Sequence, residues 1–193
     1  MLADKTVREL LAEFAAPEPT PGGGSASALA SAVGASLLAM VAALPKTRSG
    51  TDDDRAVLER AGAALAGLRT ELTAAIDDDS AAYDGVVAAF KLPKSSESDL
   101  QARRAAIQRA TMAATEVPMS VMRLSASAVE QAALVEAHGI PSAASDVGVA
   151  IALLRAGLEG ARLNVEINLD GLKNADYTER IRRDITSLLS ALR

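Results

Sequence analysis

The residues with the clearest chemical potential are three consecutive glycines and the serine that follows them. Gly22, Gly23 and Gly24 come after two prolines and directly before Ser25, so the backbone there can approach another group with no Cβ in the way. We expect a helix to begin just after this turn with Ser25 as its N-cap, leaving free N–H groups that suit an anion or a carbonyl oxygen. No lysine follows the glycines, which argues against a Walker A nucleotide-binding loop. The alternative is a plain connection without a ligand.

The second chemical candidate is a carboxylate on an apolar stripe. A helix predicted from about Thr51 to Phe90 carries apolar residues at helical spacing, and Asp79 lies on that stripe between Ile76 and Tyr83. A carboxylate on a buried face is unfavourable unless it is hydrogen-bonded or paired. Asp79 is therefore either a structural partner of an arginine or a functional group with a raised pKa.

Further polar groups lie in the second half of the chain. His138, the one histidine, ends a predicted helix, where we interpret it as a surface residue or one that compensates the helix dipole. Asp146, Asn164 and Asn168 share a stripe of small and polar residues on the next helix. Asp146 and Asn164 are 18 residues apart, roughly 27 Å along a helix, so they cannot both touch one small ligand within one subunit. We expect the asparagines to form hydrogen bonds between helices.

The elements that position these residues are all predicted to be helices. Apolar periodicity and stop signals predict helices over about 4–14, 25–44, 51–90, 99–139, 141–169 and 176–193, with no strand pattern and no repeat. Pro118 is expected to kink or split the fourth. The second is rich in Ala, Ser and Gly, which predicts a central, buried helix. We predict one all-α domain over residues 1–193, an up-and-down bundle of long helices.

Composition narrows the class of protein. The chain has 193 residues, 49% hydrophobic and 23% charged, with a net charge of −5 that argues against nucleic-acid binding. Without cysteine there is no disulfide, thiol nucleophile or thiolate metal site, and we predict no metal. The 27 residues from Pro19 to Pro45 carry no charge. Frequent Ser and Gly argue against a membrane span there, and no basic segment indicates a signal peptide. A cytoplasmic location is the expectation.

Six short motifs occur in one order over nearly the whole chain. They are Pro19–Ser25, Asp77–Asp79 with Tyr83, Leu92–Lys94, Glu116–Pro118, Ser145–Ala150 and Asn164–Leu169. Together they resemble the cyclodeaminase/cyclohydrolase family of folate one-carbon enzymes, which includes stand-alone bacterial proteins and the carboxy-terminal domain of formimidoyltransferase-cyclodeaminase. The resemblance implies an all-helical subunit that works as a homodimer, with the folate in a cleft between or beside subunits.

The resemblance also implies the reaction. The substrate would be a tetrahydrofolate derivative, and no cofactor is expected beyond this one-carbon carrier. The 5-formimidoyl form would close to 5,10-methenyltetrahydrofolate with loss of ammonia; alternatively, the 5,10-methenyl and 10-formyl forms would interconvert. Both reactions pass through a tetrahedral carbon and require proton transfers. A folate-binding protein without catalysis and a structural bundle without a ligand are the remaining alternatives.

Residue roles follow from the same resemblance. Asp79 or Asp146 is our hypothesis for the acid/base, with the backbone N–H groups of residues 22–25 holding the pterin or the reacting centre. The glutamate tail would meet Lys46 or Arg48, or the Arg103/Arg104 pair. The substrate-binding residues predicted in this way are Pro21, Gly22, Gly23, Gly24, Ser25, Lys46, Arg48, Tyr83 and Ser145.

Two segments depart from the family pattern. Members usually carry Gly-Asn-Pro-Asn where this chain has Gly139–Ser142, so that Ile140 and Ser142 replace two amides. A Gly-Lys-Lys-Lys-Tyr-like stretch commonly follows the central helix, where this chain has Lys46–Gly50. Both changes fall where polar contacts to a ligand are expected.

Overall fold

The computed structural model describes residues 1–191, and every regular element in that range is helical. The α-helices are α1 (Val7–Ala15), α2 (Gly23–Ala42), α3 (Asp52–Phe90), α4 (Glu97–His138), α5 (Ala144–Asp170) and α6 (Ala175–Ala191). Two short 3₁₀ helices, η1 (Leu2–Asp4) and η2 (Pro141–Ala143), precede α1 and α5. The all-α prediction is confirmed, and the predicted last helix extends over residues 192–193, outside the described residues.

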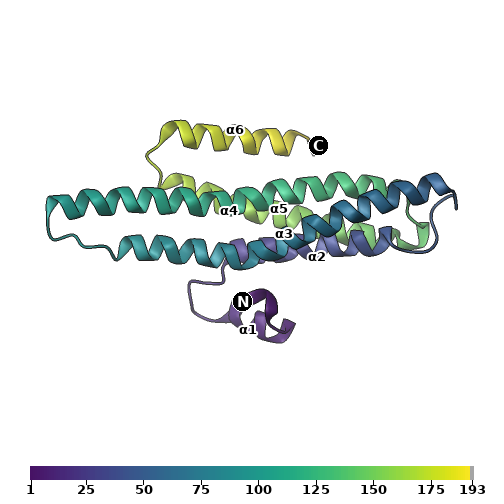
Figure 1. The fold of residues 1–193 in the computed structure, drawn as a ribbon, viewed down its shortest axis with the longest axis horizontal. Helices are drawn as coiled ribbons and strands as arrows, with labels where there is room; N and C mark the ends of the chain where they lie inside the picture. The colour runs from purple at the N-terminus through teal and green to yellow at the C-terminus, as the bar shows by residue number, and fades with distance from the viewer. Residues whose placement is uncertain (192–193) are drawn as a thin grey trace.

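The four long helices form the body of the molecule. Each packs against two neighbours, in the ring α2, α3, α4, α5 and back to α2. Short connections make neighbours in this ring run in opposite directions, as expected for an up-and-down bundle. Figure 1 shows that the α3–α4 hairpin extends past the beginning of α2, while α1 and α6 lie on opposite sides of the bundle.

Small residues bring α2 and α5 close together. A Cβ added to Gly157 would lie 2.0 Å from Ser31 Oγ, and one added to Gly160 would lie 2.3 Å from Ser27 Oγ. Neither glycine has positive φ, so the lack of a side chain, and not backbone freedom, is what the packing requires. Ser31 is fully buried, where its hydroxyl bonds that of Ser125 on α4 at 2.7 Å. The predicted central helix of small residues is confirmed.

Helix α2 also explains the long uncharged stretch. Among the described residues it is the one helix long and apolar enough to cross a bilayer. More than half of its apolar window is buried inside the bundle. Burial between α3 and α5 accounts for its composition without a membrane.

The start of α2 differs from the prediction. Its N-cap is Gly22, whose carbonyl accepts the Ala26 N–H at 3.1 Å, and not Ser25. Ser25 lies in the first turn and is fully buried. It does not cap the helix because its N–H and its hydroxyl both contact groups of α3.

Pro118 neither splits nor ends its helix, and α4 is one helix from Glu97 to His138. Proline lacks an N–H, so the carbonyl of Ala114, four residues earlier, has no helical donor. Asn168 of α5 supplies the donor instead, with Nδ2 3.1 Å from Ala114 O. A side chain of the neighbouring helix thus replaces the missing backbone bond.

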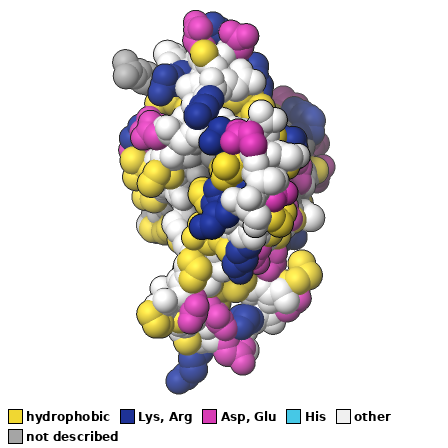
Figure 2. All heavy atoms as spheres, turned by 90° about the vertical axis from the view of Figure 1, so that its left-hand side faces the viewer, with side chains coloured by type: hydrophobic (Ala, Val, Ile, Leu, Met, Phe, Trp, Pro, Cys, Tyr) yellow, Lys and Arg dark blue, Asp and Glu magenta, His cyan; other side chains and the backbone are white. Residues whose placement is uncertain are grey.

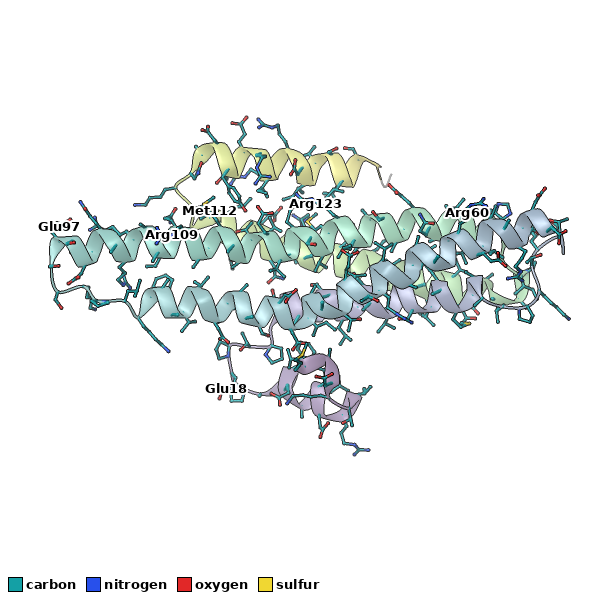
Figure 3. The ribbon with its side chains drawn as sticks, in the orientation of Figure 1. Glu18, Arg60, Glu97, Arg109, Met112 and Arg123 are labelled. Carbon is teal, nitrogen blue, oxygen red and sulfur yellow. The ribbon has the colours of Figure 1, made fainter. Side chains whose placement is uncertain are left out.

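Helix α6 lies on the outer side of α4. The Tyr177 hydroxyl donates to Glu116 Oε1 at 2.8 Å and also lies 3.2 Å from Met112 O, and Arg123 pairs with Asp184 at 3.2 Å. Figure 3 labels Met112 and Arg123 on the side of α4 that faces α6. Burial and the neighbouring Glu116 raise the pKa of Tyr177 to about 12, so its hydroxyl stays protonated.

Candidate active site

The glycine turn and three long helices surround a cavity at one end of α2. Its volume of about 360 Å³ is within the range of sites that bind small molecules. The turn contributes Pro19, Thr20, Gly22, Gly23 and Gly24; α3 contributes Asp79, Tyr83 and Val86; α4 contributes Thr111 and Ala114; α5 and its end contribute Asn164, Ile167, Asn168 and Gly171. The structure therefore brings the predicted glycines, Asp79 and Tyr83 together.

Asp79 lies directly against the glycine turn. The Ser25 N–H donates to its Oδ2 at 2.9 Å. A Cβ added to Gly24 would lie 2.0 Å from Asp79 Oδ1, closer than any real contact. Residue 24 must therefore be glycine because the carboxyl group occupies the space of a side chain, and not because of its φ.

The Ser25 hydroxyl stabilises a charged Asp79 only weakly. Ser25 Oγ lies 2.8 Å from the Ile76 carbonyl oxygen and 3.1 Å from Asp79 Oδ2. A hydroxyl has one hydrogen, and a carbonyl can only accept. While Ser25 donates its hydroxyl hydrogen to Ile76, its N–H is the Ser25 donor left for the carboxylate.

Burial acts in the same direction. It raises the pKa of the Asp79 carboxyl and outweighs the lowering by the bonds from Ser25. Among residues 1–191 no arginine or lysine pairs with Asp79. Of the two interpretations of this carboxylate, the structural ion pair is wrong, and the group with a raised pKa is the one observed.

Two asparagines of α5 line the same cavity, although sequence reasoning did not include them in the site. Asn168 bonds Ala114 O on α4, which confirms the predicted contact between helices. For Asn164 that prediction is wrong, because its Nδ2 donates to Gly160 O of its own helix at 2.8 Å. The signal that could have found them was the stripe of small and polar residues on α5, which indicated a ligand as an alternative to a neighbouring backbone.

Other predicted site residues lie elsewhere. Pro21 is buried behind the turn, and Ser25 contacts Asp79 from the protein side. Lys46 and Arg48 are in the α2–α3 loop at the opposite end of the bundle, where Arg48 donates to Glu136 O at 2.8 Å.

Ser145 and Asp146 also lie at that opposite end, because they begin α5. Ser145 is exposed and Asp146 is half-buried. The 18 residues between Asp146 and Asn164 correspond to roughly 27 Å of helix. Within one subunit, the two carboxylates proposed as acid/base therefore belong to separate places.

The opposite end of the bundle contains a carboxylate with a hydrogen-bond partner on each of its two oxygens. Asp54, near the start of α3, accepts a bond from the Ser49 N–H at 2.7 Å and lies 2.8 Å from His138 Nδ1. These bonds, that with His138 first, lower the pKa of Asp54. His138 thus joins the end of α4 to the start of α3 and does more than compensate a dipole. The sequence indicated Asp54 only as part of a helix start.

The cavity can hold a neutral polar molecule and transfer a proton to or from it. Its lining residues include a carboxyl group with a raised pKa and two amides, but no lysine, arginine or histidine. Within residues 1–191, no three His, Asp or Glu side chains come close enough together to hold a metal ion.

Comparison with known proteins decides the family. The sequence model of the formiminotransferase-cyclodeaminase family matches residues 6–187. The chain belongs to this family. It is 36% identical over 190 residues to a methenyltetrahydrofolate cyclohydrolase of Methylorubrum extorquens, covering 98% of this chain and 91% of that protein. It is 31% identical to the formimidoyltransferase-cyclodeaminase of Sus scrofa over 97% of this chain, which spans only 35% of that longer protein.

The fold agrees with the family. A crystal structure of a formiminotetrahydrofolate cyclodeaminase from Thermotoga maritima covers 100% of this chain with a TM-score of 0.88 and 25% sequence identity. The chain accounts for 92% of that structure. The helical architecture is therefore that of a solved member of the family, and the resemblance found in the six motifs is confirmed.

Proposed function

We propose that the protein is a folate one-carbon enzyme that cyclises 5-formimidoyltetrahydrofolate to 5,10-methenyltetrahydrofolate with release of ammonia. The observation that carries this proposal is Asp79, a half-buried carboxyl with a raised pKa beside the glycine turn. Family membership supports the substrate class. Pro21 and Ser25 would act from behind the cavity wall, by shaping the turn and holding Asp79.

In the proposed mechanism, one carboxyl group moves the proton that the reaction requires. N10 attacks the carbon of the protonated formimidoyl group with its lone pair, the C=N π bond breaks onto the formimidoyl nitrogen, and the N10 proton passes to the Asp79 carboxylate. The tetrahedral carbon then carries an amino group. Asp79 returns the proton to that amino group, the C–N bond breaks, and ammonia leaves with the bonding pair. A pKa raised towards the working pH suits both transfers.

Hydrolysis of 5,10-methenyltetrahydrofolate to the 10-formyl form is the second candidate. The cyclohydrolase of Methylorubrum extorquens favours it, because the chain covers 91% of that relative's length. Water would replace N10 as the nucleophile, and Asp79 would pass the proton of the water to N5 as the C–N5 bond breaks. The cytoplasmic location predicted from the sequence suits either reaction.

The glutamate tail requires positive charge outside the cavity. Arg103 and Arg104 lie on α4 eight and seven residues before Thr111, roughly 11 Å along the helix. Figure 2 looks at this end of the molecule and shows Lys and Arg side chains gathered over it. Arg103 also bonds Phe90 O at 3.1 Å, which leaves exposed Arg104 as the tail's first contact.

A homodimer is part of the proposal. Val33 and Met40 on α2 and Val149, Leu163 and Ile167 on α5 are all at least 42% exposed. Since α2 and α5 are neighbours, these residues form one uncharged face, which a second copy of this chain would cover. Ile167 also lines the cavity, so the covered face and the site are continuous.

The dimer would reunite the predicted site residues. Val33 lies near the middle of α2, so a two-fold axis that passes close to it and perpendicular to the helix would set the two α2 helices antiparallel. The glycine turn of one copy then lies near the α2–α3 loop of the other. Lys46, Arg48, Ser145 and Asp146 would reach the cavity of the other copy, where they would serve as tail contacts and as a second carboxylate.

An ultraviolet assay tests the reaction. Purified protein is given 5-formimidoyltetrahydrofolate, and separately 5,10-methenyltetrahydrofolate, while the methenyl chromophore is followed. Its appearance from the first substrate supports the cyclodeaminase, and faster loss of the second supports the cyclohydrolase. If both rates equal the uncatalysed ones, the proposed function is wrong.

A further inference from the structure

Pro118 leaves a backbone carbonyl without its helical donor, and this affects the orientation of a side chain that lines the cavity. Because proline cannot donate, the Ala114 carbonyl is open to another donor. Asn168 bonds this carbonyl through Nδ2, since only the amide NH₂ can donate to a carbonyl oxygen. Ala114 and Asn168 both line the cavity. The orientation of the Asn168 amide is therefore set by a proline on another helix.

The amide of Asn164 is oriented in the same way, because its nitrogen also donates to a backbone carbonyl, here one of its own helix. Its Nδ2 donates to Gly160 O at 2.8 Å, and the same nitrogen would lie 3.3 Å from a Cβ added to Gly23. Asn164 is four residues before Asn168 on α5, which places both on one face with their Cβ atoms about 5–6 Å apart. The two amides are thus a matched pair.

Each asparagine leaves its oxygen free. Within residues 1–191 neither Asn164 Oδ1 nor Asn168 Oδ1 accepts a bond from the protein. No buried side-chain nitrogen or oxygen of that range lacks a partner, so both oxygens are open to solvent. Since both residues line the cavity, its α5 wall offers two acceptor oxygens, and each amide nitrogen uses one of its two N–H groups to bond a backbone carbonyl.

We propose that Asn164 and Asn168 select the ring of the ligand by accepting hydrogen bonds from N–H groups along its edge, and that Pro118 is the positioning residue for Asn168. The inference rests on the proposed function for the ligand. A reduced pterin carries N–H donors at the 2-amino group and N3 of its pyrimidine ring and at N8 of its reduced pyrazine ring. A ring with hydrogen-bond acceptors at these places would meet the two amide oxygens instead of donors.

Calorimetric titration with two probes tests the pair. The first probe is 5-formyltetrahydrofolate, and the second is its analogue with a methyl group in place of the 2-amino group. We expect the wild-type protein to bind the first about 10-fold more tightly, the size of one good hydrogen bond. Asn168→Ala or Asn164→Ala should weaken the first probe about 10-fold and the analogue much less. At least one of the two variants should lose the preference.

Two further variants distinguish a role in ligand selection from a purely structural role. Gln101→Ala, on an exposed amide of α4, is the matched control and should keep both affinities. Pro118→Ala restores an N–H that competes for Ala114 O, so it should reduce the preference for the amino probe even if helix α4 becomes no less stable. A purely structural role for Pro118 would change both affinities by one factor and leave the preference intact.

The results distinguish this inference from the proposed function. If wild-type protein binds neither probe, the folate assignment itself is wrong. If it binds 5-formyltetrahydrofolate, but both asparagine variants keep the wild-type preference, the proposed function stands and the selection by Asn164 and Asn168 is overturned. Equal weakening of both probes in properly folded variants overturns it as well.

Discussion

Two aspartates of helix α3 show how the two ends of the bundle differ. Asp54 lies where the connecting loops meet, and its carboxylate bonds the Ser49 N–H and His138. Asp79 lies at the cavity, with Ser25 as its neighbour and no basic partner among residues 1–191. The pKa of Asp54 is lowered, while that of Asp79 is raised.

The comparison separates a structural carboxylate from a reactive one. Both residues are partly or wholly buried on the same helix, so burial alone does not decide the direction of the pKa. Hydrogen-bond donors stabilise the charge of Asp54, whereas Ser25 shares its single hydroxyl hydrogen with Ile76 and stabilises that of Asp79 less. The loop end is thus fully paired, and the cavity end keeps a proton available for chemistry.

The largest effect is expected for Asp79→Asn. An amide cannot accept and return the proton, so turnover should fall by about 10²–10⁴-fold. Asp78→Asn, on the exposed neighbour, makes the same charge change and should keep normal turnover. The measurement is the steady-state rate in the methenyl assay, and equal turnover of both variants would remove Asp79 from the mechanism.

The same variant should not lose stability at neutral pH. A raised folded-state pKa contributes stability below the unfolded pKa of about 3.9, and this contribution is lost as the pH rises through the folded pKa. Above the folded pKa the ionised carboxylate of Asp79 therefore gives the folded state no such advantage, and the neutral amide of the variant avoids the cost of burying a charge. We expect the melting temperature of the variant to equal or exceed that of the wild type, and a marked fall would contradict the raised pKa.

Gly24→Ala tests how closely Asp79 must approach the turn. The new Cβ would collide with the carboxyl group, which has to move by an ångström or more, and turnover should fall about 100-fold. Gly67→Ala is the control, because nothing lies within 4 Å of the added Cβ. That control should keep its activity and gain about 0.5–1 kcal/mol of stability in urea unfolding. Full activity of Gly24→Ala would mean that the contact is unimportant.

Val33→Glu tests whether the cavity end of one subunit meets the loop end of another subunit in a dimer. A charge on the uncovered α2–α5 face should weaken pairing more than 10-fold, by about 1.4 kcal/mol or more, and shift the protein to monomer in analytical ultracentrifugation. Ala63→Glu, on an exposed position of α3, should leave the mass unchanged. If the site needs the partner subunit, turnover falls with dissociation. A fully active monomer would show that the cavity end works alone.

The smallest expected effect is that of Asp54→Asn, and it depends on pH. The lowered folded-state pKa contributes stability above the unfolded pKa of about 3.9, which is lost as the pH falls through the folded pKa. The variant should therefore be less stable than the wild type near pH 7, and the difference should shrink as the pH falls below about 3.9 towards the folded pKa, with turnover little changed. Asp53→Asn, an exposed neighbour, provides the comparison in urea unfolding. A loss of stability that stays the same across this pH range would contradict the assignment.

Much of the fold could be predicted because its signals are local. Apolar periodicity, Thr51 and the prolines gave helix limits within a few residues of those observed for α3 and α5. Ser25 does not cap its helix and Pro118 does not split its helix, for a common reason. A capping serine and a helix-breaking proline follow local rules, and in both places a group from another helix, Asp79 or Asn168, supplied the alternative.

The residues of the candidate site also fall into those that the sequence identified and those that it did not. Asp79 and the glycines were recognised from the sequence because a carboxylate on an apolar stripe and a turn without Cβ atoms are unusual in themselves. The role of Asn168 was not recognised from the sequence, because its amide orientation depends on a carbonyl 54 residues away.

The sequence by itself determined the helices, their order, the small-residue faces and the family motifs, since each depends on spacing along the chain. The tertiary structure alone decided which carboxylate lies in a cavity and which has its charge stabilised by hydrogen-bond donors, because pKa values depend on neighbours in space. It also placed Ser145 and Asp146 at the end opposite to Asp79, because the part of α5 that lies beside Asp79 is the one around Asn164, 18 residues after Asp146.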